Sequence, residues 1–256
     1  MCGIVGYVGK ENAASILIDG LSKLEYRGYD SAGIAVLDDS QENKEIEVIK
    51  AKGRLQALRE MTDNGRAVKG CCGIGHTRWA THGEPSVVNA HPHVSKDRKI
   101  AVVHNGIIEN YKEIKEYLQK KGYEFLSETD TEVIAHLLDY YYKGNPLEAI
   151  TKVLGRVRGS YALGILFQEN PGVMYAVRKD SPLIIGKSAQ GNFIASDVPA
   201  ILKYTKTVCY IDDREIAEIT ADSIRFYDVD QEELQKEFKT VEWDAKAAED
   251  RKSTRL

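Results

Sequence analysis

The chain opens with Met1-Cys2-Gly3-Ile4-Val5-Gly6-Tyr7, a cysteine followed directly by a short apolar run. Removal of the initiator methionine would leave a thiol and a free α-amine on one residue. Such an amine has an ordinary pKa of about 8, so at neutral pH part of it is uncharged and can accept the thiol proton. Residues 4–8 predict a buried strand that leads away from this thiol. A cysteine in second position is more often structural, so the interpretation depends on the rest of the chain.

Length and composition exclude several classes of protein. The chain has 256 residues, 43% of them hydrophobic, which suits one large globular domain or two small ones. The net charge is −4 and no basic stripe with interleaved aromatics occurs, which argues against nucleic acid and anionic membranes as partners. Apolar runs are too short to span a bilayer, and no positively charged leader precedes them, so we expect a cytoplasmic protein.

The cysteines give no sign of a metal site or a disulfide framework. They lack CxxC spacing and have no histidine nearby at ligand spacing; they are Cys2, Cys71, Cys72 and Cys209. We therefore expect no metal and no cofactor, and we interpret the last three cysteines as small buried side chains.

Hydrophobic periodicity predicts mixed helices and short strands. Helices are predicted at residues 12–26, 55–61, 111–121, 130–142, 146–157 and 197–204. Strands are predicted at residues 4–8, 34–37, 45–51, 71–74, 100–103, 161–167, 173–178, 183–186, 192–195, 207–211, 214–219 and 224–227. The late strands are short and joined by turns, which indicates antiparallel pairing.

Polar clusters follow several predicted strands. Residues 76–85 are too rich in hydrogen-bonding groups for a core, so they are expected to form a binding loop. His104-Asn105-Gly106 is predicted to be a turn after a strand, and Asp130 lies where a helix should begin. Taken singly, Arg78 could be a surface ion pair, Asn105 part of a turn and Asp130 a helix cap.

Together with Cys2, these clusters resemble a known family. MCGIVGY at 1–7, RGYDSAG at 27–33, HTRWATHG at 76–83, HNG at 104–106 and SETDTE at 127–132 are similar to class II glutamine amidotransferases, and most similar to the glutaminase half of glucosamine-6-phosphate synthases. The similarity runs from Cys2 to about Ala248. It implies the α+β fold of N-terminal-nucleophile hydrolases, a four-layer αββα sandwich of two antiparallel sheets between helical layers.

The resemblance also implies how a zwitterionic substrate would be held. Arg78 would grip the α-carboxylate of L-glutamine, with hydrogen bonds added by Thr81 and His82 from the same loop. Asp130 would hold the α-ammonium group. Trp79 resembles a mobile residue that closes over the site, and Arg27 is expected to border it.

For the reaction itself, the resemblance implies covalent catalysis. Cys2 would attack the side-chain amide, release ammonia and form a γ-glutamyl thioester, with its own amine moving the protons. The Asn105 amide and the Gly106 backbone N–H would form the oxyanion hole. The histidines at 76, 91 and 104 are expected to be packed or hydrogen-bonding groups rather than the base.

Two alternatives remain open at this stage. Amidophosphoribosyltransferase and asparagine synthetase carry related glutaminase domains, and a catalytically silent module could keep the fold to bind glutamine.

We expect a domain at residues 2–240 and a linker or tail at 241–256, of which residues 250–256 do not resemble the family's continuation. The sugar-isomerase half, which binds fructose 6-phosphate, is absent from this sequence, so we expect a fragment of a longer enzyme that is at least a homodimer.

Overall fold

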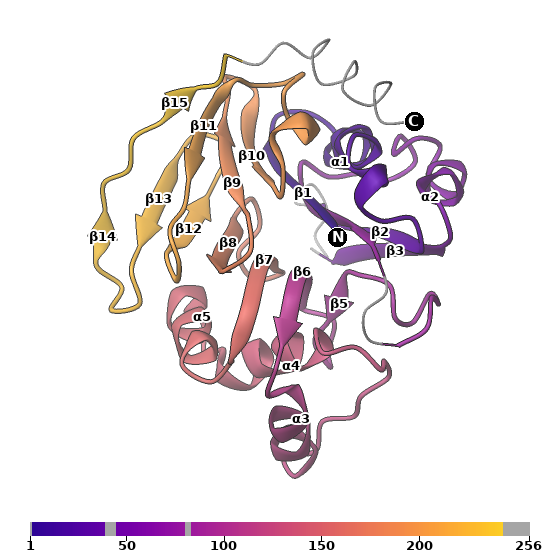
Figure 1. The fold of residues 1–256 in the computed structure, drawn as a ribbon, viewed down its shortest axis with the longest axis vertical. Coiled ribbons are helices and arrows are strands. Elements are labelled where there is room, and N and C mark those ends of the chain that lie inside the picture. The colour runs from indigo at the N-terminus through magenta and orange to yellow at the C-terminus, as the bar shows by residue number, and fades with distance from the viewer. Residues whose placement is uncertain (1, 39–44, 80–82, 243–256) are drawn as a thin grey trace.

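A computed structural model describes residues 2–38, 45–79 and 83–242, and within them the chain forms two antiparallel sheets (Figure 1). The first has eight strands in the order β15-β11-β9-β10-β1-β4-β2-β3, and the second has seven in the order β14-β13-β12-β8-β7-β6-β5. The first sheet contains β1 (Gly3–Gly9), β2 (Ser31–Leu37), β3 (Ile46–Lys52), β4 (Cys72–Arg78), β9 (Ile184–Lys187), β10 (Gly191–Ala195), β11 (Thr207–Tyr210) and β15 (Lys239–Thr240). The second contains β5 (His93–Val94), β6 (Ile100–Ile108), β7 (Gly159–Phe167), β8 (Met174–Lys179), β12 (Ile216–Ile219), β13 (Ile224–Tyr227) and β14 (Glu233–Leu234).

Helices cover the outer faces of the two sheets. Helices α1 (Ala13–Ser22) and α2 (Leu55–Met61) pack on the first sheet, together with the 3₁₀ turns η1 (Glu25–Arg27) and η2 (Val198–Ala200). Helices α3 (Tyr111–Gln119), α4 (Glu132–Tyr141) and α5 (Pro146–Leu154) pack on the second sheet and lie at the bottom of Figure 1. Strands β1 and β4 contact β6, which joins the two sheets face to face. The predicted four-layer sandwich is confirmed.

The central strands are buried on both faces, which explains their continuous apolar sequences. In β1, Ile4 and Val8 belong to the core between the sheets, whereas Val5 and Tyr7 belong to the core under α1. The same alternation occurs in β6, where Val103 faces the other sheet and Val102 faces the helices. Because successive side chains point to opposite faces, each strand feeds two hydrophobic cores at once.

Two predicted loops are strand in the structure. Strand β4 continues to Arg78 through residues assigned to a binding loop, and β6 continues to Ile108 through the predicted His104-Asn105-Gly106 turn. Strand β4 is paired along this stretch with both β1 and β2, and β6 is paired with β7 as far as Ile108 and with β5 at Ala101 and Val102. Continued pairing satisfies the backbone, and the polar side chains bond one another across the sheets.

Other differences are smaller. The helix predicted at 12–26 ends at Ser22 and is followed by η1, and the helix predicted at 197–204 is reduced to η2. Strands β5, β14 and β15 were not predicted. The predicted tail lies outside the described residues from position 243 onward, so the domain boundary stays a prediction. Within the described part, none of the helices combines the length and hydropathy that crossing a membrane requires.

Candidate active site

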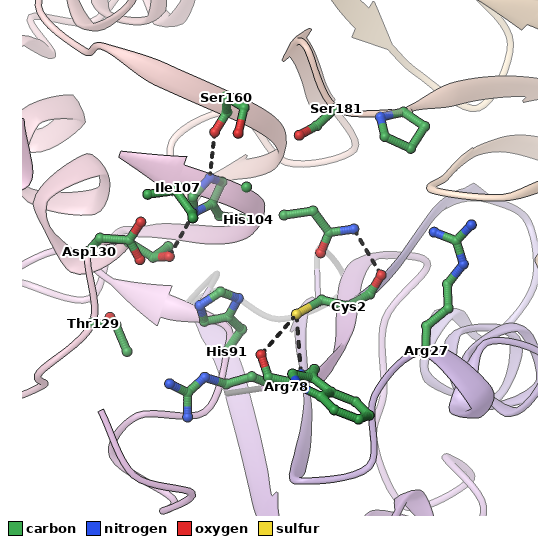
Figure 2. Close-up of a pocket in the computed structure, with 15 residues that line it drawn as sticks. Cys2, Arg27, Arg78, His91, His104, Ile107, Thr129, Asp130, Ser160 and Ser181 are labelled. Carbon is green, nitrogen blue, oxygen red and sulfur yellow. Dashed lines mark hydrogen bonds between the residues drawn. The ribbon is translucent and has the colours of Figure 1, made fainter. Parts of the chain in front are cut away.

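One cavity, with a volume of about 280 Å³, lies where the two sheets meet the N-terminus (Figure 2). That volume is at the small end of pockets that bind metabolites. The cavity is lined by Cys2, Arg27, Arg78, Trp79, His91, His104, Asn105, Gly106, Ile107, Thr129, Asp130, Thr131, Ser160, Ser181 and Pro182. Seven of the nine site residues predicted from the sequence therefore line one cavity. The other two, Thr81 and His82, lie outside the described residues.

Cys2 is held by both sheets. The Trp79 N–H donates to Cys2 Sγ at 3.2 Å, and the thiol donates to the Trp79 carbonyl at 3.5 Å. The Asn105 side chain donates from Nδ2 to the Cys2 carbonyl at 3.1 Å. Burial raises the pKa of the Cys2 thiol, although the Trp79 N–H and the Arg78 charge oppose this. The thiol is thus protonated at neutral pH, and its use as a nucleophile requires a base.

Asn105 and Gly106 lie side by side in β6, beside that thiol. The Asn105 side chain is 9% exposed, and its Oδ1 lies 3.0 Å from His76 Nε2. Gly106 has a φ of +131°, a conformation that side chains rarely adopt. A Cβ built there would lie 2.1 Å from the Ser160 carbonyl oxygen of β7, so only glycine fits without a shift of backbone.

Charges of opposite sign line the cavity at Arg78 and Asp130, and each side chain is 4% exposed. Arg78 ends β4, and its guanidinium donates to the carbonyls of Gly83 at 3.1 Å and Glu84 at 3.4 Å. Burial lowers the pKa of Arg78 from its ordinary value, while nearby acidic groups act in the opposite direction. Asp130 precedes α4, and its Oδ2 accepts from the Ile108 N–H at 2.7 Å. Strand β6 thus fixes the carboxylate.

Trp79 and Arg27 form the rim. Trp79 is 44% exposed, and its ring meets the ring of Tyr29 edge-on at 5.3 Å. Arg27 Nη2 pairs with Asp197 Oδ2 at 2.8 Å, so this guanidinium is bound to a carboxylate of the protein. Asp30, three residues after Arg27 in the sequence, donates its backbone N–H to the Arg78 carbonyl at 3.1 Å.

Several lining residues were not predicted. They are His91, His104, Ile107, Thr129, Thr131, Ser160, Ser181 and Pro182. His104 Nδ1 lies 2.9 Å from Thr131 Oγ1, and His104 Nε2 lies 3.5 Å from the Ser160 carbonyl. Ser160 could have been located from the sequence only with the β6–β7 register, in which it pairs with Ile107.

The histidines near the cavity are buried and bond to groups other than the Cys2 thiol. Burial lowers the pKa of His76 to about 3 and lowers those of His91 and His93 well below the ordinary range. These rings are neutral at pH 7. Over the residues that the structure describes, no cluster of three or more His, Cys, Asp or Glu side chains is arranged to hold a metal ion.

Comparison with known sequences places the chain in a family. The sequence pattern of a family described as a glutamine amidotransferase domain matches residues 33–247. The chain belongs to the glutamine amidotransferase domain family. It is 58% identical over 249 residues to the glutamine–fructose-6-phosphate aminotransferase (isomerizing) of Clostridium acetobutylicum and 48% identical to that of Aquifex aeolicus. The match covers 97% of this chain but 40% of the first relative and 41% of the second.

Solved structures of glutamine amidotransferases share the architecture. The glutamine phosphoribosylpyrophosphate amidotransferase of B. subtilis, complexed with ADP and GMP, aligns with a TM-score of 0.77 and 26% identity over 89% of this chain and 49% of that one. A glutamine aminotransferase class-II domain protein from Silicibacter pomeroyi aligns with a TM-score of 0.62 over 89% of this chain and 99% of that one. The latter is 16% identical, so it supports the fold alone.

Proposed function

We propose that this glutamine amidotransferase domain hydrolyses L-glutamine to L-glutamate and ammonia at Cys2. The observation that carries the proposal is the lining of one small cavity by a thiol, a guanidinium and a carboxylate, at Cys2, Arg78 and Asp130. Glutamine carries a carboxylate, an ammonium group and an amide at its far end. The cavity offers a charge of opposite sign for each charged group on the α-carbon and a nucleophile for the amide.

In the first half of the reaction, Cys2 Sγ attacks the amide carbon while its proton passes to a base. The negative charge that develops on the amide oxygen is stabilised by the Asn105 Nδ2–H and the Gly106 N–H. The proton then passes to the leaving nitrogen, the C–N bond breaks and ammonia departs. A γ-glutamyl thioester remains. Water attacks the thioester in the second half, the base takes a proton from the water, and the C–S bond breaks to give glutamate and the thiol.

The base in this proposal is the α-amine of Cys2, freed by removal of Met1. Two observations support this assignment. The described thiol contacts are to the Trp79 backbone, and His76, which hydrogen-bonds Asn105, has its pKa lowered to about 3. An imidazole with so low a pKa is a poor proton acceptor at neutral pH. An uncharged α-amine is a better one.

The remaining predicted residues act by holding the substrate. Arg78 binds the α-carboxylate and Asp130 the α-ammonium, while Thr81 and His82 add hydrogen bonds. Trp79 covers the cavity. Arg27 contributes through its ion pair with Asp197, which holds η1 against the start of η2.

In a longer protein, we propose that the ammonia converts fructose 6-phosphate to glucosamine 6-phosphate. The chain spans about 40% of the length of the curated glutamine–fructose-6-phosphate aminotransferases it matches. The acceptor, the sugar-isomerase half, assembly into a dimer or larger oligomer and a cytoplasmic location are all part of this proposal. The alternative acceptor, phosphoribosylpyrophosphate, has weaker support, because the identity is 26% to that amidotransferase and 58% to the sugar-phosphate enzyme.

The test is a glutaminase assay on purified protein, with glutamate and ammonia measured separately and Cys2→Ala as the control. We expect both products in equal amounts from wild type and neither from the variant. Binding of glutamine without turnover would favour the silent module instead. Added fructose 6-phosphate should give no amino sugar, because the sequence matches about 40% of the length of its relatives. Detection of glucosamine 6-phosphate would overturn that expectation.

A further inference from the structure

His76 has no assigned role, although it is bonded to the proposed oxyanion hole. It lies in β4 opposite Ile4 of β1, and Ile4 belongs to the core between the sheets. Directly opposed residues of paired strands share a face, so the imidazole faces the second sheet. It is 0% exposed, and it lies outside the set of residues that line the cavity.

The partners of His76 Nε2 determine where its proton lies. Nε2 is 3.0 Å from the His104 carbonyl oxygen and 3.0 Å from Asn105 Oδ1. Both atoms only accept hydrogen bonds, so Nε2 carries the proton and donates to them. His91 Nδ1, 3.2 Å from the same nitrogen, must then present its lone pair. The neutral ring is therefore the Nε2–H tautomer.

The Asn105 amide is thereby held in one of its two orientations. Its Oδ1 receives the His76 proton, and its Nδ2 donates to the Cys2 carbonyl at 3.1 Å. The terminal torsion of asparagine is broad and nearly two-fold, so an unanchored amide turns over readily. In the reversed orientation, Oδ1 would face both the Cys2 carbonyl and the charge that develops on the substrate oxygen.

We propose that His76 is a positioning residue that orients the Asn105 amide so that its N–H, and not its carbonyl, faces the reacting oxygen. The inference rests on the proposed glutaminase activity. It predicts that loss of the Nε2 donor lowers kcat and leaves KM nearly unchanged, because the α-carboxylate and the α-ammonium of the substrate are bound elsewhere, by Arg78 and Asp130. Loss of an oxyanion donor typically costs about 100- to 1000-fold in rate, and loss of its orientation should cost part of that, about 10- to 100-fold.

The variants separate orientation from packing. His76→Leu removes the donor, and His76→Gln can return an amide N–H close to the Nε2 position. His76→Asn carries the same amide on a side chain too short to reach. The matched control is His93→Leu, which also removes a buried imidazole and one side-chain hydrogen bond, from His93 Nε2 to Thr129 Oγ1 at 3.0 Å. Thermal unfolding is measured for every variant.

Support requires three results: a kcat loss in His76→Leu beyond that in His93→Leu, partial recovery in His76→Gln, and no further loss when His76→Leu is added to Asn105→Ala. If His76→Leu does not fold, the test is the comparison of His76→Gln with His76→Asn. Equal kcat values in those two variants would refute the positioning role of His76. A folded His76→Leu with wild-type kcat would refute it also, as would an undiminished loss in the Asn105→Ala background. An inactive wild-type protein would refute the proposed function itself, and this inference with it.

Discussion

Replacement of Gly106 by alanine tests the geometry of the proposed oxyanion hole most directly. The added Cβ would lie 2.1 Å from the Ser160 carbonyl oxygen, 2.7 Å from the Ser160 carbonyl carbon and 3.0 Å from Tyr161 Cα. All three are backbone atoms of β7, which pairs with β6 throughout this region. No side chain can rotate away to relieve the contact, so the strands themselves must separate.

The expected cost has two parts. A residue other than glycine at the φ of +131° costs about 1–3 kcal/mol in backbone strain. A relaxed contact between carbon and oxygen needs roughly 3.3 Å, so β6 must also move by about an ångström, and such overpacking costs about 1–3 kcal/mol more. The free energy of unfolding should fall by about 2–6 kcal/mol in total. Because the Gly106 N–H moves with the strand, kcat should fall by about 100-fold.

Gly144→Ala is the matched control, because Gly144 also has a positive φ, of +91°, and an added Cβ there meets nothing within 4 Å. It should show the strain cost alone, with kcat unchanged. Urea denaturation of both variants gives the free energies of unfolding, and a coupled glutamate assay gives kcat and KM. The predicted backbone clash would be refuted if Gly106→Ala had the same urea midpoint of unfolding as Gly144→Ala and hydrolysed glutamine at the wild-type rate.

Three further predictions concern the proposed nucleophile, the charged clamp and a half-buried lysine. A glutamine-mimicking electrophile should label Cys2 in protein whose intact mass shows that Met1 is absent. Full activity in protein that uniformly retains Met1 would exclude the α-amine of Cys2 as the base. Asp130→Asn and Arg78→Lys should each weaken glutamine binding by on the order of 2–5 kcal/mol. Glutamine analogues without the corresponding charged group should lose far less binding free energy between wild type and variant. Calorimetry that finds unchanged glutamine affinity in both variants would refute the clamp. Burial lowers the pKa of Lys50 from its ordinary 10.5 to about 8. Between these two pH values the unfolded chain holds this proton more than the folded chain does, so the free energy of unfolding should rise as the pH rises across that range. At pH 7, Lys50→Met should have a free energy of unfolding higher than that of wild type by at most about 3 kcal/mol. If denaturation curves show that this difference does not become smaller by pH 10, the lowered pKa of Lys50 is contradicted.

The sequence predicts the strands that carry hydrophobic side chains better than the strands that carry the site. Residues 4–8 and 161–167 are apolar throughout, and both are strands in the structure. Strands β4 and β6 begin with the same kind of pattern, but then continue into polar residues, which local propensity assigns to loops. Pairing with neighbouring strands decides their length, with β1 and β2 for β4 and with β7 for β6, and a single sequence does not show these partners.

Alternation within those two strands is the signal that could have placed the site. Counting in twos from Ile74, a residue of the core between the sheets, brings His76 and then Arg78 to the same face of β4. The same count from Val103 places Asn105 on the inner face of β6. The partners of these side chains could not be predicted, because the contact of β4 with β6 joins different sheets and no spacing along the chain encodes it.

The position of Cys2 shows why the fold needs two sheets for this chemistry. The Trp79 N–H, at the end of the first sheet, holds the thiol, while Asn105 of the second sheet holds the carbonyl of the same residue. The proposed nucleophile and the proposed oxyanion donor are therefore held by different sheets, and the packing between the sheets fixes the distance between them. Side chains such as Ile74 and Val103 contribute to that packing, so they influence the alignment of the reacting groups without touching the substrate.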